Sequence, residues 1–198
     1  IGTMAKLCAF SKSSVVLQHC ASILANLSKH NEYQSQIADQ GGIACLVDLC
    51  GRSQEVDSST LRFVTSAMKD LSLSEYGQAK LTKASLILAL IRMCDSTTVL
   101  RNTPLLTDVA EIFAYISMNT TCTEQMSHEG AGQFLTSLLG PKQDGQVLRY
   151  AAGALRRDRE AVLAAVAHGG FALHYASPSA LRADREAVKV EKRKLLVA

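Results

Sequence analysis

The sequence is poor in the residues that interrupt helices, with three prolines and twelve glycines among 198 residues. Such sparse chain breakers favour helices over a β-sandwich, which needs many turns. No run approaches the roughly 20 apolar residues of a membrane-spanning helix. Hydrophobic residues make up 47% of the chain and charged residues 20%, with a net charge of +3, which excludes a largely disordered chain. We therefore expect a helical protein without a membrane span.

Motifs that carry enzymatic chemistry are also missing. The sequence has no Gly-x-Ser-x-Gly motif, phosphate-binding loop or His-Glu-x-x-His motif, and its five histidines stand at no recognisable spacing from a serine, cysteine or acid. It starts at Ile1 without a basic and then apolar leader, so we expect a fragment without a signal peptide. The sequence predicts no enzyme and no cofactor.

The six cysteines have no pattern of metal ligands. All of them except Cys122 lie in apolar runs, no Cys-x-x-Cys pair occurs, and no histidine lies at ligand spacing from a cysteine pair. We interpret the cysteines as small buried residues of a reducing compartment. The expected location is the cytoplasm, with the nucleus as an alternative.

An apolar pattern recurs along the first three-quarters of the chain. It spans Leu17–Ser28, returns at Leu61–Ser72 and Leu106–Ser117, and begins again at Leu148. The steps are 44, 45 and 42 residues, which is the spacing of solenoid repeats built from two or three helices.

A second set of segments lies between these copies. Four short apolar helices are expected, at Ile1–Phe10, Gly42–Cys50, Ala84–Cys94 and Ala131–Leu139. In the first complete unit a polar helix at Asn31–Ala38 precedes Gly41-Gly42, where the chain must turn sharply. Each unit is thus a short first helix, a tight turn, a second helix and a longer third helix. Neighbouring units must stack, because none can bury its apolar stripe alone.

Residues 14–50 closely resemble part of an armadillo array. The segment Leu24-Ala-Asn-Leu-Ser28 ends one third helix, and Gly41-Gly42-Ile43 joins the next two helices. The resemblance implies an all-α, right-handed α-solenoid of roughly three repeats over residues 1–154, with incomplete first and last repeats. It also implies that the third helices line a concave groove that binds an extended peptide or a partner protein.

The C-terminal region, residues 155–198, follows a different pattern. Leu155-Arg-Arg-Asp-Arg-Glu-Ala-Val162 is echoed by Leu181-Arg-Ala-Asp-Arg-Glu-Ala-Val188, and residues 155–188 resemble a short helical repeat of unknown function. Residues 1–140 have a net charge of −2, whereas residues 141–198 have a net charge of +5. The tail is either a second type of solenoid repeat or the product of a faulty gene model.

Steps of four residues along each third helix give the side chains expected to line the groove. These are Gln18, Ser22, Asn26, Arg62, Ser66, Asp70, Thr107, Glu111, Tyr115, Arg149, Gly153 and Arg157. Asn26 matches the armadillo asparagine that, as the resemblance implies, hydrogen-bonds the backbone of a ligand. Nuclear-import armadillo proteins have a tryptophan four residues earlier. Here that residue is Ser22, and the chain has no tryptophan, so a receptor for nuclear localisation signals is not expected.

The sequence leaves two other interpretations of these residues. The polar positions could form only a solvated face, or the basic region around Arg156-Arg157 and Lys192-Arg-Lys194 could bind nucleic acid. Aromatic residues that would stack on bases make up only 5% of the chain, so a protein or peptide partner is the favoured prediction. Salt separates the two, because phosphate contacts weaken steeply as salt concentration rises.

Overall fold

The computed structural model describes residues 1–137, with a few side chains excepted, and this part of the chain is helical and contains no strand. The helices are α1 (Gly2–Phe10), α2 (Ser14–Ser28), α3 (Asn31–Asp39), α4 (Gly42–Gly51), α5 (Ser58–Leu71), α6 (Glu75–Lys83), α7 (Leu86–Cys94), α8 (Thr97–Leu100), α9 (Thr103–Ile116), α10 (Thr120–His128) and α11 (Ala131–Ser137).

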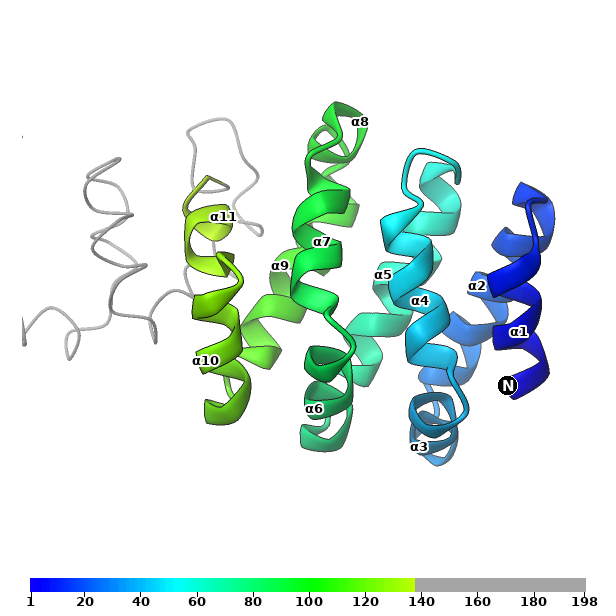
Figure 1. Cartoon of the computed structure of the whole chain (residues 1–198), viewed down its shortest axis with the longest axis horizontal. Helices are drawn as coiled ribbons and strands as arrows, with labels where there is room; N and C mark the ends of the chain where they lie inside the picture. The colour runs from blue at the N-terminus through cyan, green and yellow to red at the C-terminus, as the bar shows by residue number, and fades with distance from the viewer. Residues whose placement is uncertain (138–198) are drawn as a thin grey trace, which may run out of the picture.

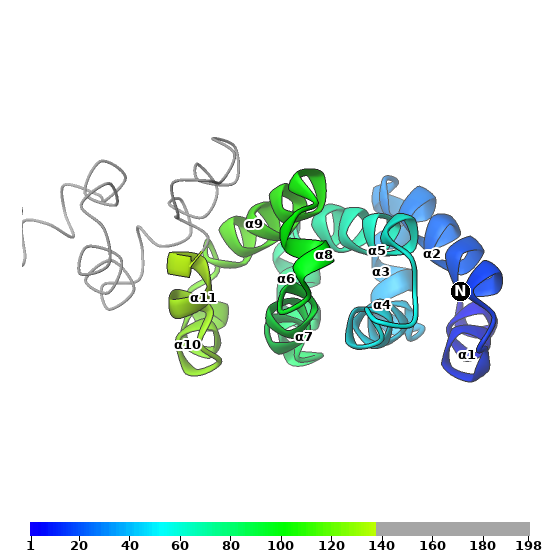
Figure 2. The same cartoon turned by 90° about the horizontal axis from the view of Figure 1, so that it is seen from above.

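The helices stack in three rows. The first helices α3, α6 and α10 form one row, the second helices α1, α4, α7 and α11 another, and the third helices α2, α5 and α9 the last. Each helix packs mainly against its neighbour in the same row and against the other helices of its own repeat. Figure 1 shows α1, α4 and α7 side by side in front of the third helices, and Figure 2 shows the two rows from above. This stacking of neighbours is the architecture of an α-solenoid.

The recurring apolar pattern forms the continuous core. Leu17, Leu61 and Leu106 occupy the same place in the three third helices, and each is at most 3% exposed. Seven residues further along the chain, Leu24, Met68 and Phe113 are fully buried. A fully buried side chain of this size stabilises the fold by about 1.5–3 kcal/mol. The sequence pattern therefore marks the positions that hold neighbouring repeats together.

The turn between the first and second helices has the same backbone geometry in each repeat. Gly41 has φ of 84°, Ser85 of 61° and Gly130 of 80°, so all three are in the left-handed region. After Gly41 the chain passes close to α3, because a Cβ at Gly42 would lie 2.9 Å from the carbonyl oxygen of Ile37. Glycine suits both positions, whereas the second repeat adopts the turn with a serine.

A buried serine lies at the C-terminal end of each third helix. Ser28, Ser72 and Ser117 are each at most 3% exposed, and each donates its hydroxyl hydrogen to the carbonyl oxygen three residues earlier, over 2.7–3.0 Å. Their own carbonyl oxygens accept hydrogen bonds from Gln34 at 2.8 Å and from Gln78 at 2.9 Å in the first two cases. These bonds satisfy carbonyl groups that a helix end leaves free.

The structure confirms the all-α solenoid and most of the expected helices. Several boundaries differ. The three third helices begin three residues before the recurring segments, at Ser14, Ser58 and Thr103, and α7 begins at Leu86 rather than Ala84, because Ser85 is left-handed. Cys122 is also buried, although it lies outside an apolar run. Leu139, the repeat copy from Leu148 and the 155–198 region lie outside the described residues. Among the described helices, none is long and apolar enough to cross a membrane.

Candidate functional site

We call the exposed and partly exposed polar residues of α2, α5 and α9 the third-helix face. It contains the predicted residues Gln18, Ser22, Asn26, Arg62, Ser66, Asp70, Thr107, Glu111 and Tyr115, all of them exposed or partly exposed. The remaining predicted residues, Arg149, Gly153 and Arg157, lie outside the described part of the chain. The packing of α2 on α5 and of α5 on α9 brings these positions onto adjacent helices.

Asn26 lies exposed in the last turn of α2. Its side-chain oxygen accepts a hydrogen bond from the ammonium of Lys29 at 3.4 Å. Its amide nitrogen has no partner among the described residues. The amide can therefore still donate two hydrogen bonds to a ligand and accept another.

Two other predicted residues tie α2 to α5. The Gln18 amide donates to the hydroxyl of Ser59 at 2.6 Å. The single hydroxyl hydrogen of Ser28 is shared between the carbonyl oxygen of Ala25 and the carboxylate of Asp70, whose oxygen lies 2.9 Å from the Ser28 hydroxyl. The two contacts between side chains join neighbouring third helices. Gln18 and Asp70 therefore position the face as well as lie on it.

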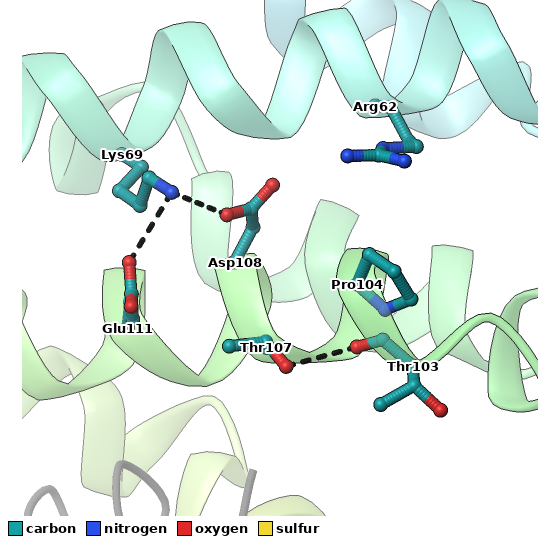
Figure 3. Close-up of a pocket in the computed structure, with 7 residues that line it drawn as sticks. All are labelled: Arg62, Lys69, Thr103, Pro104, Thr107, Asp108 and Glu111. Atoms are coloured by element: carbon teal, nitrogen blue, oxygen red, sulfur yellow. Dashed lines mark hydrogen bonds and ion pairs between the residues drawn. The ribbon is translucent and has the colours of Figure 1, made fainter. Parts of the chain in front are cut away.

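A hollow of about 440 Å³ opens between α5 and α9 (Figure 3). Its lining consists of Arg62, Lys69, Thr103, Pro104, Thr107, Asp108 and Glu111. The ammonium of Lys69 lies 2.5 Å from a carboxylate oxygen of Asp108 and 3.3 Å from one of Glu111. The Lys69 side chain is 29% exposed, and those of Asp108 and Glu111 are 13% and 15% exposed. This triad is thus partly shielded from water.

Lys69 stays charged at neutral pH. Burial alone would lower the pKa of Lys69, but the hydrogen bond and charge of Asp108, with those of Glu111, outweigh it and raise the pKa above its ordinary value. Lys69 is therefore held as an ammonium and neutralises much of the negative charge of the hollow.

Arg62 differs from Lys69 in having no such partner. Its guanidinium is exposed at the other end of the hollow, beside Pro104 (Figure 3), and no carboxylate of the described residues lies within ion-pair distance of it. Five N–H donors in a planar fork are therefore open to solvent or a ligand.

Lys69 and Asp108 are the charged lining residues that the sequence reasoning missed. Residues four apart follow one inclined row along a helix. Because a helix has 3.6 residues per turn, residues seven apart also lie on the same face. Lys69 is seven residues after Arg62, and Asp108 adjoins the predicted Thr107. The opposite charges of Lys69 and Asp108, in neighbouring third helices, were the sequence feature that could have indicated this ion pair.

A second hollow, of about 580 Å³, lies between α3 and α6. Beside it, the hydroxyl of Tyr76 donates to Asp39 at 2.5 Å, and the ammonium of Lys80 lies 2.8 Å from the same carboxylate oxygen. These bonds, from Lys80 first and then Tyr76, lower the pKa of Asp39. The cluster is exposed and links two neighbouring first helices, so we assign it to the packing of the repeats.

All six cysteines are buried and form no disulfide. In the part of the chain that the structure describes, no group of three histidine, cysteine or acidic side chains could hold a metal ion. Burial raises the pKa of Cys20 to about 11 and that of Cys94 to about 12, and it also raises that of Cys50. Such thiols stay protonated at neutral pH and are poor nucleophiles and ligands.

Comparisons with known proteins support the fold. No family model matches the sequence, and no curated protein matches it. Among solved structures, an engineered protein matches with a TM-score of 0.72 and 18% identity over 100% of this chain and 90% of the other. A computationally designed armadillo repeat protein for modular peptide recognition matches with a TM-score of 0.73 and 18% identity, over 95% of this chain and 80% of the other.

Another similar structure contains a ligand. It is a designed armadillo repeat protein in complex with the peptide (KR)4, with a TM-score of 0.70 and 17% identity, over 95% of this chain and 80% of the other. The resemblance to armadillo repeats that the sequence predicts is therefore confirmed at the level of the fold. At sequence identities of 17% and 18%, the similarity shows a shared fold only.

Proposed function

We propose that the protein is a non-catalytic scaffold that holds an extended segment of a partner protein against the third-helix face. The observation that carries this proposal is the alignment of polar, accessible positions on three consecutive helices, with Asn26 free to form hydrogen bonds. Most apolar residues of these helices lie in the core, whereas the polar residues of the face remain accessible.

Extended peptides suit such a face. A peptide in this conformation has unpaired N–H and C=O groups along its length, and they need partners when the peptide is bound. The Asn26 amide offers both a donor and an acceptor to one of these peptide units. Ser22 and Ser66 lie on the same face and offer hydroxyl groups beside it.

The similar solved structures support a peptide as the partner. One is described as designed for modular peptide recognition, and another is in complex with a peptide. We carry this property over to the present chain as a proposal, on the ground that both share its solenoid fold and that its third-helix face is polar and hollowed. Its six cysteines are buried and form no disulfide, which suits a reducing compartment, and we propose the cytoplasm as the site of action.

The test is a capture experiment with matched variants. The 198-residue chain is immobilised and used to capture partners from its own cell type, in parallel with Asn26→Ala and Asn31→Ala. Asn31 is also an exposed asparagine, and it lies in α3 rather than on a third helix. We expect Asn26→Ala to weaken the affinity of the captured partner about five- to a hundredfold, since an unpaired ligand group costs about 1–3 kcal/mol, while Asn31→Ala binds like the wild type.

Two outcomes would contradict the proposal. Equal binding by wild type and Asn26→Ala would show that the third-helix face is not the working surface. Capture of nucleic acid whose binding falls steeply between low and physiological salt would favour the basic C-terminal region instead.

A further inference from the structure

We infer that the segment bound at the hollow between α5 and α9 carries an acidic side chain, which pairs with the guanidinium of Arg62. This inference rests on the proposed function and specifies its partner. It follows from the charges of the hollow: both carboxylates are engaged by Lys69, whereas Arg62 has no acid partner among the described residues.

The two acids are not free to bind a basic ligand. Asp108 and Glu111 are each less than one-sixth exposed, and both contact the ammonium of Lys69. A lysine or arginine of a ligand would have to displace that ammonium and remain partly desolvated itself. Removing one member of a shielded charge group is costly, because it leaves the others without a partner.

Arg62 can bind an acidic side chain of a ligand without displacing an existing acid partner. Its planar fork of N–H donors matches the two oxygens of a carboxylate. Beside it the wall of the hollow is formed by Pro104, which has no charge, and by Thr107, whose hydroxyl donates to the backbone of Thr103 at 2.9 Å. An acidic side chain at this end therefore meets a cation that pairs with no described carboxylate, while the two acids of the hollow are held by Lys69.

A second cation without an acid partner lies on the neighbouring helix. Lys29 follows α2, and its ammonium contacts the side-chain oxygen of Asn26, the residue proposed to hold the backbone of the ligand. No described carboxylate lies within ion-pair distance of Lys29. A cation without an acid partner thus lies at both points where we place the ligand, and the acid of the face that forms no ion pair among the described residues, Asp70, is engaged by the hydroxyl of Ser28. An acidic ligand would contrast with the basic (KR)4 peptide of the similar designed structure.

A nucleic acid is also anionic, but it fits the face less well. Its strand has a phosphate at every nucleotide, so phosphates beyond Arg62 would lie against Asp108 and Glu111. A peptide can place one acidic residue at Arg62 and neutral residues beside the triad. Tyr115 is the one aromatic side chain among the predicted lining residues, which leaves few rings for bases to stack on.

The test uses four fluorescein-labelled probes and the 198-residue chain. Three are peptides of about twelve residues with alternating serine and glutamine, in which two central glutamines are kept, replaced by glutamate or replaced by lysine. The fourth is an oligouridine of similar length. Fluorescence anisotropy at physiological salt gives the affinity of each probe for the wild type, Arg62→Gln and Arg92→Gln. Arg92 is an exposed arginine of α7, away from the third-helix face, so the last variant has the same change of net charge.

We expect the glutamate peptide to bind most tightly. Arg62→Gln should weaken its binding roughly three- to tenfold and bring it to the level of the neutral peptide, whereas Arg92→Gln should have no effect. Tighter binding of the lysine peptide, with a loss in Glu111→Gln, would overturn the inference but leave the scaffold proposal intact. Tighter binding of oligouridine, or no preference among the peptides, would also overturn it. The comparison of Asn26→Ala with Asn31→Ala decides the scaffold proposal separately.

Discussion

Replacing Lys69 by methionine tests whether the triad fixes α5 against α9. Methionine keeps most of the length of the side chain and removes the ammonium that contacts Asp108 at 2.5 Å and Glu111 at 3.3 Å. The two carboxylates are then left close together in a partly shielded site. We expect the variant to fold, because the apolar core of α5 is unchanged, but with a lower free energy of unfolding.

The size of the effect lies between two limits. Exposed ion pairs contribute about 0–1 kcal/mol, and breaking a fully buried one costs about 3–5 kcal/mol. The exposed fractions of 13–29% in this triad place it between these limits. We therefore expect a loss of about 1–3 kcal/mol, which lowers the melting temperature by roughly 2–4 °C per kcal/mol for a chain of this size.

The assay is urea unfolding followed by circular dichroism, with Lys6→Met as the control. Lys6 is exposed in the middle of α1. The pKa of Lys69 is raised in the folded state, so its contribution is fully present below the ordinary lysine value near 10.4 and is lost as pH rises through the higher folded value. The difference between wild type and Lys69→Met should therefore stay constant from about pH 6 to pH 9. A loss no larger than that of Lys6→Met would refute the reasoning.

Other predictions concern the fold. Gly42→Ala should destabilise the protein by about 1–3 kcal/mol in thermal unfolding, because the added Cβ would lie 2.6 Å from a side-chain carbon of α3. Gly51→Ala meets open space and should be neutral or stabilising. Equal effects of the two variants would contradict this prediction. Asp57→Ala should cost about 1 kcal/mol, because the carboxylate accepts from the backbone N–H of Thr60 at 2.7 Å. That hydrogen bond lowers the pKa of Asp57, so the stabilisation by the carboxylate is present above the ordinary pKa near 3.9 and disappears as pH falls through the lower pKa of the folded state. Asp57→Asn should keep the cap and lose less stability in acid than the wild type. Urea titrations at pH 2–6 can measure this difference. Removal of residues 155–198 should leave the rest helical and cooperatively folded by circular dichroism, because packing runs between neighbouring repeats; complete loss of helicity would mean that the boundary is misplaced.

Most of the fold could be predicted from the sequence, because burial follows the spacing of apolar residues. Leu17, Leu61 and Leu106 recur at nearly constant steps and occupy equivalent buried places. The turn at Ser85 could not be predicted in the same way. Serine has no intrinsic preference for a left-handed backbone, and only the packing of the helices on either side holds it there.

The candidate site was less predictable, because it depends on how neighbouring helices are aligned. The sequence reasoning placed Glu111 and Asp70 on the third-helix face without their partners. The structure shows Glu111 paired with Lys69, and Asp70 hydrogen-bonded to Ser28 one repeat earlier. Such pairs join residues that are about 40 positions apart, so the lateral offset between helices has to be known before they can be seen. Arg62 was predicted to line the groove, but its lack of an acid partner appears only when those pairs are placed.

Site-specific photocrosslinking tests the central claim, that a partner lies along the third-helix face, most directly. A photoreactive phenylalanine replaces either Tyr115 in α9, which is partly exposed, or Tyr76 in α6, which is exposed and belongs to the row of first helices. Each variant is irradiated with the captured partner, and crosslinked products are identified by mass spectrometry. We predict that the partner crosslinks from position 115 and not from position 76. Crosslinking from position 76 alone would contradict the account and place the partner on the row of first helices.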